Sequence, residues 1–190
     1  MGANPVLRYT IDEYLEMDEL AEHKSEYHDG EVFPMVDASD EHAILAVNMG
    51  AALHRVLKPG CVARATPRVQ PTDARFVYPD LAVVCGKANY VRNCLINPRL
   101  IVEVLSPSTA DYDAGGKFKL YQLLPSFEEY LLIAQDRPRV DYFRRMGPGH
   151  WSLQISEGLD ATVELAIAEA PFTLRELYSN VTFSPVEEEP

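Results

Sequence analysis

The stretch Leu100-Ile101-Val102-Glu103-Val104-Leu105-Ser106-Pro107 decides how this chain folds. Its first six residues are an apolar run that predicts a buried central strand. Pro107 ends that strand, because proline lacks the N–H that a sheet ladder requires. A single carboxylate, Glu103, interrupts the run. Burying a charge without a partner costs much free energy, so Glu103 is expected to have an ionic partner or to serve a site.

A second apolar run upstream repeats this arrangement. Within Phe76–Cys85, Asp80 follows Tyr78-Pro79 and precedes four more apolar residues. Two carboxylates on neighbouring strands repel each other. A divalent cation such as Mg²⁺, which prefers oxygen ligands, would relieve both the repulsion and the cost of burial. The alternative is that each carboxylate pairs with an arginine or lies in water at the end of its strand.

The elements predicted around these two strands indicate an α/β (α+β) protein. Thr10 and Glu13 have the capping-box spacing that starts a helix at Ile11, and Asp29-Gly30 is a typical hairpin turn within 25–35. The other expected elements are helices over about 41–57 and 114–124, strands over about 61–66, 129–134, 139–145, 151–156 and 162–168, and a last helix after Thr173. The middle of the chain therefore predicts a mixed central sheet flanked by helices, with additional antiparallel strands.

Length and composition are ordinary for a globular protein. The chain has 190 residues, of which 47% are hydrophobic and 24% charged, and no linker divides it. We therefore expect a single domain over 1–190, frayed at about 1–9 and 185–190. No run approaches the roughly 18 apolar residues of a membrane span, and the first residues do not resemble a signal peptide. These features predict a cytoplasmic protein without a membrane partner, with Cys61, Cys85 and Cys94 as reduced thiols.

Charge is distributed unevenly along the chain. The net charge of −12 argues against nonspecific binding of nucleic acid by the whole surface. Between residues 54 and 99, however, the only acids are Asp73 and Asp80, against these bases: Arg55, Lys58, Arg64, Arg68, Arg75, Lys87, Arg92 and Arg99. The window indicates either a phosphate-binding surface or chance enrichment on a solvated face. The candidates for contact with a nucleic-acid backbone are Arg64, Arg68 and Arg75.

Lys117 and Tyr121 are four residues apart and share one face of the helix predicted after Glu103. A lysine beside two metal-bound carboxylates could orient the attacking water or stabilise the charge that develops on a phosphate. A lysine at such a position is otherwise an exposed helix residue. Lys119 points elsewhere on the helix and is the weaker candidate.

The motif Tyr78-Pro79-Asp80, followed by Ile101–Thr109 (IVEVLSPST), resembles the Uma-type putative restriction endonuclease family of the PD-(D/E)XK nuclease superfamily. The resemblance extends from Tyr9 to Phe183. It includes Glu26, Gly30-Glu31, His42, Asp113–Lys117, Tyr121 and Glu129-Tyr130.

The resemblance implies a restriction-endonuclease-like αβββαβ core and an endonuclease that hydrolyses the DNA backbone with Mg²⁺, for which Mn²⁺ substitutes. It implies Asp80 and Glu103 as metal ligands, with the main-chain carbonyl near Val104 and the carboxylate of Glu26 as further ligands. The superfamily motif has a lysine two residues after the glutamate, where this chain has Leu105.

The resemblance suggests that Lys117 takes the place of that lysine, with Tyr121 in support. His42 is expected to cap or pack rather than to act as a base. We expect a homodimer.

Two alternatives stay open at this point. Leu105 and the acidic net charge favour a catalytically inactive nucleic-acid-binding or structural module with the same fold. A metal-dependent enzyme acting on RNA is the other alternative, because no base-reading motif separates DNA from RNA.

Overall fold

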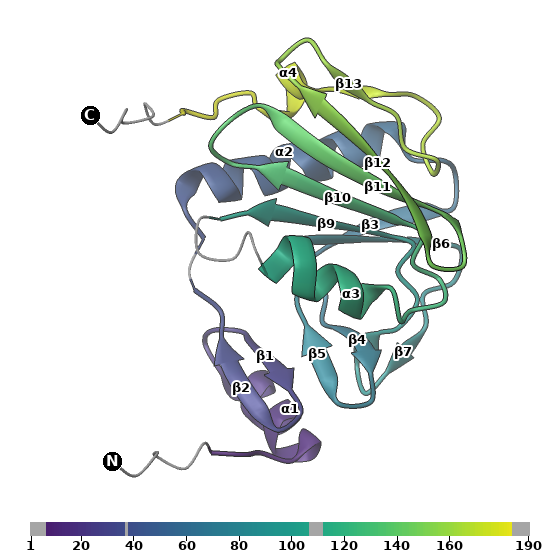
Figure 1. Cartoon of the computed structure of the whole chain (residues 1–190). Helices are drawn as coiled ribbons and strands as arrows, with labels where there is room; N and C mark the ends of the chain where they lie inside the picture. Colours follow the sequence, from purple (N-terminus) through teal and green to yellow (C-terminus); the bar gives the residue numbers. More distant parts are fainter. Residues whose placement is uncertain (1–6, 37, 107–111, 184–190) are drawn as a thin grey trace.

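The predicted central strand lies inside a six-stranded sheet with the order β12-β11-β10-β9-β6-β3 (Figure 1). The computed structural model of the chain describes residues 7–36, 38–106 and 112–183. β9 (Leu100–Leu105) runs parallel to β10 (Glu129–Ala134) and antiparallel to β6 (Leu81–Cys85). The outer strands, all in antiparallel pairs, are β3 (Cys61–Ala65), β11 (Arg139–Gly147) and β12 (His150–Glu157). The sheet is mixed, which confirms the prediction.

Alternating side chains of β9 divide the hydrophobic core between the two faces of this sheet. Val102 and Val104 are buried with α2 (Asp40–Val56) and the C-terminal segment, whereas Ile101 is buried on the other face with Tyr121. Figure 1 accordingly shows α2 behind the sheet and α3 in front of it. The period of two along a strand therefore directs Glu103, two residues after Ile101, toward the face that α3 covers.

The helix between β9 and β10 is less regular than the prediction over 114–124, which is wrong in detail. A π-helical turn, η1 (Tyr112–Lys117), leads into a short α-helical segment, α3 (Phe118–Tyr121). Glycine is a poor helix former, so Gly115-Gly116 weakens an ordinary α-helix here. The order α2, β3, β6, β9, α3, β10 confirms the predicted αβββαβ core.

A second sheet, with the order β2-β1-β5-β4-β8-β7, lies below the first in Figure 1. Its strands are β1 (Ser25–His28), β2 (Glu31–Pro34), β4 (Val69–Thr72), β5 (Arg75–Val77), β7 (Tyr90–Val91) and β8 (Cys94–Leu95). The predicted hairpin β1–β2 is confirmed, as is the capping box that starts α1 (Ile11–Leu20). Tyr14 of α1 packs on Tyr27 and Phe76 and so holds α1 against this sheet.

The single strand predicted over Phe76–Cys85 is divided between the two sheets. β5 belongs to the second sheet and β6 to the central one, and Tyr78-Pro79-Asp80 connects them. Proline cannot donate to a ladder, which accounts for the break. Asp80 therefore lies where the two sheets meet.

The prediction of three reduced cysteines is wrong for two of them. Cys61 and Cys85 form a disulfide between β3 and β6, where the register places them directly opposite each other. Cys94 is free and buried. The two bonded cysteines are 24 residues apart, and their spacing in the sequence does not reveal the pairing.

The C-terminal segment covers the α2 face of the central sheet. The predicted strand over 162–168 is reduced to β13 (Thr162–Val163), paired with β14 (Phe172–Thr173), although Leu165 and Ile167 continue the alternating burial into the core. α4 (Leu174–Leu177) begins at the predicted capping box of Thr173 and Glu176.

The beginning of the described chain is anchored. Tyr9 was expected within the frayed end, yet its N–H donates to the carbonyl of Gly30 at 2.8 Å. Over the described ranges, no helix has both the length and the hydropathy to cross a membrane.

Candidate active site

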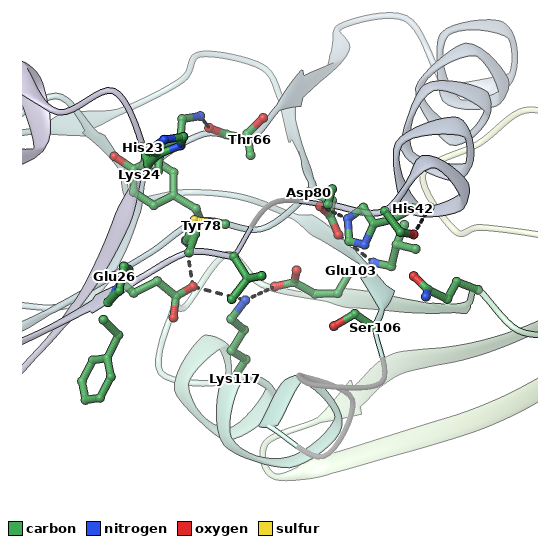
Figure 2. A pocket seen from close by; sticks show the side chains of 18 of the residues that line it. His23, Lys24, Glu26, His42, Thr66, Tyr78, Asp80, Glu103, Ser106 and Lys117 are labelled. Atoms are coloured by element: carbon green, nitrogen blue, oxygen red, sulfur yellow. Dashed lines mark hydrogen bonds and ion pairs between the residues drawn. The ribbon is translucent and has the colours of Figure 1, made fainter.

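Asp80 and Glu103 come together through the antiparallel register of β6 and β9. Leu81, the first residue of β6, pairs with Val102, so Asp80 just before the strand lies opposite Glu103. The N–H of Val104 donates to Asp80 Oδ2 at 2.7 Å and fixes this carboxylate beside β9. Both carboxylates line the same pocket (Figure 2).

Lys117 lies between two carboxylates from different sheets. Its Nζ is 3.2 Å from Oε1 of Glu26 on β1 and 3.4 Å from Oε1 of Glu103 on β9. Figure 2 shows the lysine reaching upward from its helix to these two groups. All three side chains are buried, so their mutual attraction must offset the cost of removing each charge from water. The irregular helix thus places the positively charged Lys117 side chain beside the carboxylate of Glu103 on the central strand.

Tyr121, one turn after Lys117, also contacts Glu103. Its hydroxyl donates to Glu103 Oε1 at 2.9 Å, and the side chain is fully buried. Burial, with the negative charge of Glu103 beside it, raises the pKa of Tyr121 well above its usual value of 10.0. Tyr121 is therefore a neutral hydrogen-bond donor that orients the Glu103 carboxylate.

Glu26 is held as an anion by its neighbours. Burial alone would raise the pKa of its carboxyl group. The hydrogen bond with His28, the charge of Lys117 and the N–H of Tyr78 outweigh that effect and hold the pKa below 4.5. At neutral pH Glu26 therefore carries the charge that the Lys117 ammonium needs.

His42 lies closer to the candidate site than its sequence position indicates. Its Nε2 is 2.7 Å from Asp80 Oδ1, although the two residues are 38 positions apart. The residue was expected to cap α2 or to pack, but Ser39 is the cap and accepts the N–H of His42. The imidazole instead orients the Asp80 carboxylate, a role that no local sequence pattern signals.

The pocket has a volume of about 890 Å³, within the range typical of small-molecule sites. It lies where the β1–β2 hairpin, the connection from that hairpin to α2, and the adjoining ends of β6 and β9 meet. Carboxylates, two lysines and three imidazoles line it together with an apolar stretch at the end of the hairpin. Charged groups with fixed geometry beside an open pocket are typical of a catalytic or binding site.

The carboxylates of Asp80 and Glu103 suit a hard divalent cation, because oxygen ligands are those that Mg²⁺ prefers. In the part of the chain that is described, no group of three or more His, Cys, Asp or Glu residues is placed to hold an ion. Mg²⁺ commonly uses only one or two protein carboxylates and takes its other ligands from water and substrate phosphate. Two convergent carboxylates in an open pocket fit that mode. Glu26, the third predicted acidic ligand, lines the same pocket and, like Glu103, contacts Lys117.

The three arginines proposed to contact a nucleic-acid backbone lie elsewhere. Arg68 is buried in an ion pair with Asp18 at 2.9 Å, and Arg75 pairs with Asp29. Arg64 donates to the hydroxyl of Tyr90 and to a main-chain carbonyl. Among the described residues no arginine lines the pocket. The structure thus brings together the predicted acids, Lys117 and Tyr121, but not the predicted basic surface.

Comparisons with known proteins identify a family and a shared fold. The family model Uma2, described as "Putative restriction endonuclease", matches residues 11–175. The uncharacterized proteins slr1290 and sll1609 of Synechocystis sp. (strain PCC 6803) are 30% and 33% identical to this chain. Their alignments cover 94% and 83% of this chain and 96% and 92% of the relatives. The crystal structure of a "putative nuclease belonging to DUF820" from Anabaena variabilis superposes with a TM-score of 0.74 at 21% identity. It covers 90% of this chain and 98% of the other, so the fold is shared over nearly its whole length.

Proposed function

This chain belongs to the Uma2 family of putative restriction endonucleases, and from that premise we propose that it is a metal-dependent nuclease that hydrolyses the DNA backbone. One observation carries the proposal: two carboxylates, those of Asp80 and Glu103, and a buried lysine meet at one open pocket. Asp80 directly precedes β6, Glu103 lies on the adjacent strand β9, and Lys117 Nζ lies 3.4 Å from Glu103 Oε1.

The superfamily motif has a lysine at the position of Leu105, and in this structure Lys117 provides a positive charge beside Glu103. Leu105 ends β9, whereas Lys117 reaches the Glu103 carboxylate from the following helix. A cation beside the strand glutamate is therefore supplied from another element. This placement supports an active enzyme over the inactive module that Leu105 favours.

Each residue has a part in the proposed chemistry. Mg²⁺ or Mn²⁺, held by Asp80 and Glu103, would polarise the scissile phosphate and lower the pKa of a bound water. The Lys117 ammonium would position the attacking water or stabilise the negative charge that develops on the phosphate. Tyr121 keeps the Glu103 carboxylate in one orientation, and His42 does the same for Asp80.

A plasmid-nicking assay with Mg²⁺ or Mn²⁺, and with EDTA as the blank, tests this proposal. Asp80→Asn, Glu103→Gln and Lys117→Ala should each abolish nicking. Lys119→Ala is the matched control, because Lys119 is exposed two residues away on the same helix and should leave nicking unchanged. Nicking that survives Asp80→Asn, or that fails with Lys119→Ala and not with Lys117→Ala, contradicts the assignment. A DNA oligonucleotide and an RNA oligonucleotide of the same sequence, assayed side by side, separate a deoxyribonuclease from a ribonuclease.

A further inference from the structure

Four consecutive apolar residues, Phe33-Pro34-Met35-Val36, form one wall of the pocket. Phe33 and Pro34 end β2, and Met35 and Val36 follow them along the chain toward α2. Phe33 is 46% exposed and Val36 82% exposed, so this wall is not part of the hydrophobic core. A run of exposed apolar residues is unfavourable in a folded protein unless it serves a contact. The wall therefore indicates a ligand with an apolar part.

The wall is linked to Lys117 through His28 and Glu26. The ring centroids of His28 and Phe33 are 5.0 Å apart, and His28 Nε2 is 3.4 Å from Glu26 Oε2. Glu26 in turn contacts Lys117. A ligand whose phosphate lies beside Lys117 would thus place its attached group near Phe33.

The charges around the pocket disfavour a continuous duplex as that ligand. Four carboxylates but only two lysines, Lys24 and Lys117, are among the described lining residues. Duplex DNA carries a dense row of phosphates and is bound through many lysines and arginines. It also keeps its bases stacked inside, where an apolar wall has no base face to contact. An unpaired nucleotide offers one phosphate and one free aromatic face.

We propose that this pocket takes an unpaired nucleotide, whose base packs on the wall at Phe33 and Met35 while its phosphate lies beside Lys117 and the divalent cation that Asp80 and Glu103 would hold. The proposal rests on the proposed nuclease function and narrows its substrate to single-stranded DNA or to unpaired segments within a duplex. Aromatic and apolar side chains beside a catalytic centre are how enzymes acting on single strands or extruded bases hold the base.

The test compares a fluorescein-labelled single-stranded oligonucleotide with the same sequence as a duplex, in two measurements. Fluorescence anisotropy with Ca²⁺ gives binding, and gel analysis with Mn²⁺ gives cleavage. Wild type should bind the single strand about tenfold or more tightly than the duplex. Phe33→Ala should weaken single-strand binding about fivefold or more, as expected for loss of one base–aromatic stack, and Phe33→Leu should weaken it less.

Leu153→Ala is the matched control, because Leu153 is a half-exposed apolar residue on β12 outside the pocket. It should match wild type in both measurements. Equal or tighter binding of the duplex, no binding of either form, or no difference between Phe33→Ala and Leu153→Ala would overturn the inference. Efficient cleavage of the duplex without strand preference would leave the nuclease proposal standing and this inference refuted. Phe33-dependent binding of the single strand without any cleavage would support the binding of an unpaired nucleotide and refute the nuclease proposal.

Discussion

Replacing Lys117 with methionine removes one positive charge from between two buried carboxylates and keeps a side chain of similar length. The side chains of Lys117, Glu26 and Glu103 are 8%, 9% and 4% exposed, and the two contacts measure 3.2 and 3.4 Å. Removing one partner of a buried ion pair typically costs about 3–5 kcal/mol, because the remaining charge is left uncompensated. Hydrogen bonds from Tyr121 and Tyr78 still reach the two carboxylates. We therefore expect the lower end, about 3 kcal/mol of unfolding free energy.

Urea unfolding followed by the fluorescence of Trp151, the single tryptophan, measures this loss. Lys119→Met is the matched control and should change stability by less than about 0.5 kcal/mol, because Lys119 is exposed. Adding Glu103→Gln to Lys117→Met should recover about 1 kcal/mol, since it removes one of the two uncompensated charges. Mn²⁺ should stabilise Lys117→Met as well, because a bound cation favours the folded state. Equal stabilities of Lys117→Met and Lys119→Met would refute the reasoning.

Three further predictions concern other parts of the molecule. His42→Ala should weaken Mn²⁺ binding about 10- to 100-fold by calorimetry, because it frees the Asp80 carboxylate to rotate, whereas His54→Ala on the exposed side of α2 should not. Burial raises the pKa of Glu129, whose carboxyl group accepts a hydrogen bond from the Tyr142 hydroxyl. The stability that the protonated carboxyl group provides is therefore present below its usual pKa of 4.5 and is lost as pH rises through its pKa in the folded protein. Melts between about pH 4 and pH 7 should therefore show Glu129→Gln gaining on wild type as pH rises, and a constant difference would contradict this. Under denaturing, non-reducing conditions one thiol, that of Cys94, should react with a thiol reagent; a count of three would contradict the cross-strand disulfide.

Features set by neighbours in the sequence were predictable. Both helix starts with capping boxes, at Thr10 and Thr173, depend on contacts across three residues. The strand Glu129–Ala134 is a continuous apolar run once its first residue is passed, and the predicted bounds match. The carboxylates at 80 and 103 could be singled out because each interrupts such a run.

Features set by register and by contacts between distant segments were not predictable. The pairing of Cys61 with Cys85 and the contact of His42 with Asp80 depend on which strands and helices become neighbours. Arg68 was grouped with a basic surface because its charge is visible in the sequence, whereas its buried partner Asp18 is 50 positions away. Strands as short as β7 and β8 have too few residues to show a period.

The division of the site between two sheets makes it sensitive to partial opening. Glu26 and the apolar wall come from the hairpin and its connection, whereas Asp80 and Glu103 are held by the central sheet. Proteins open locally at a lower free energy than they unfold as a whole. A molecule whose hairpin has come away would keep its central sheet, yet Lys117 would lose one of its two carboxylates. Under the proposed function, nuclease activity should therefore be lost at milder conditions than those that unfold the central sheet.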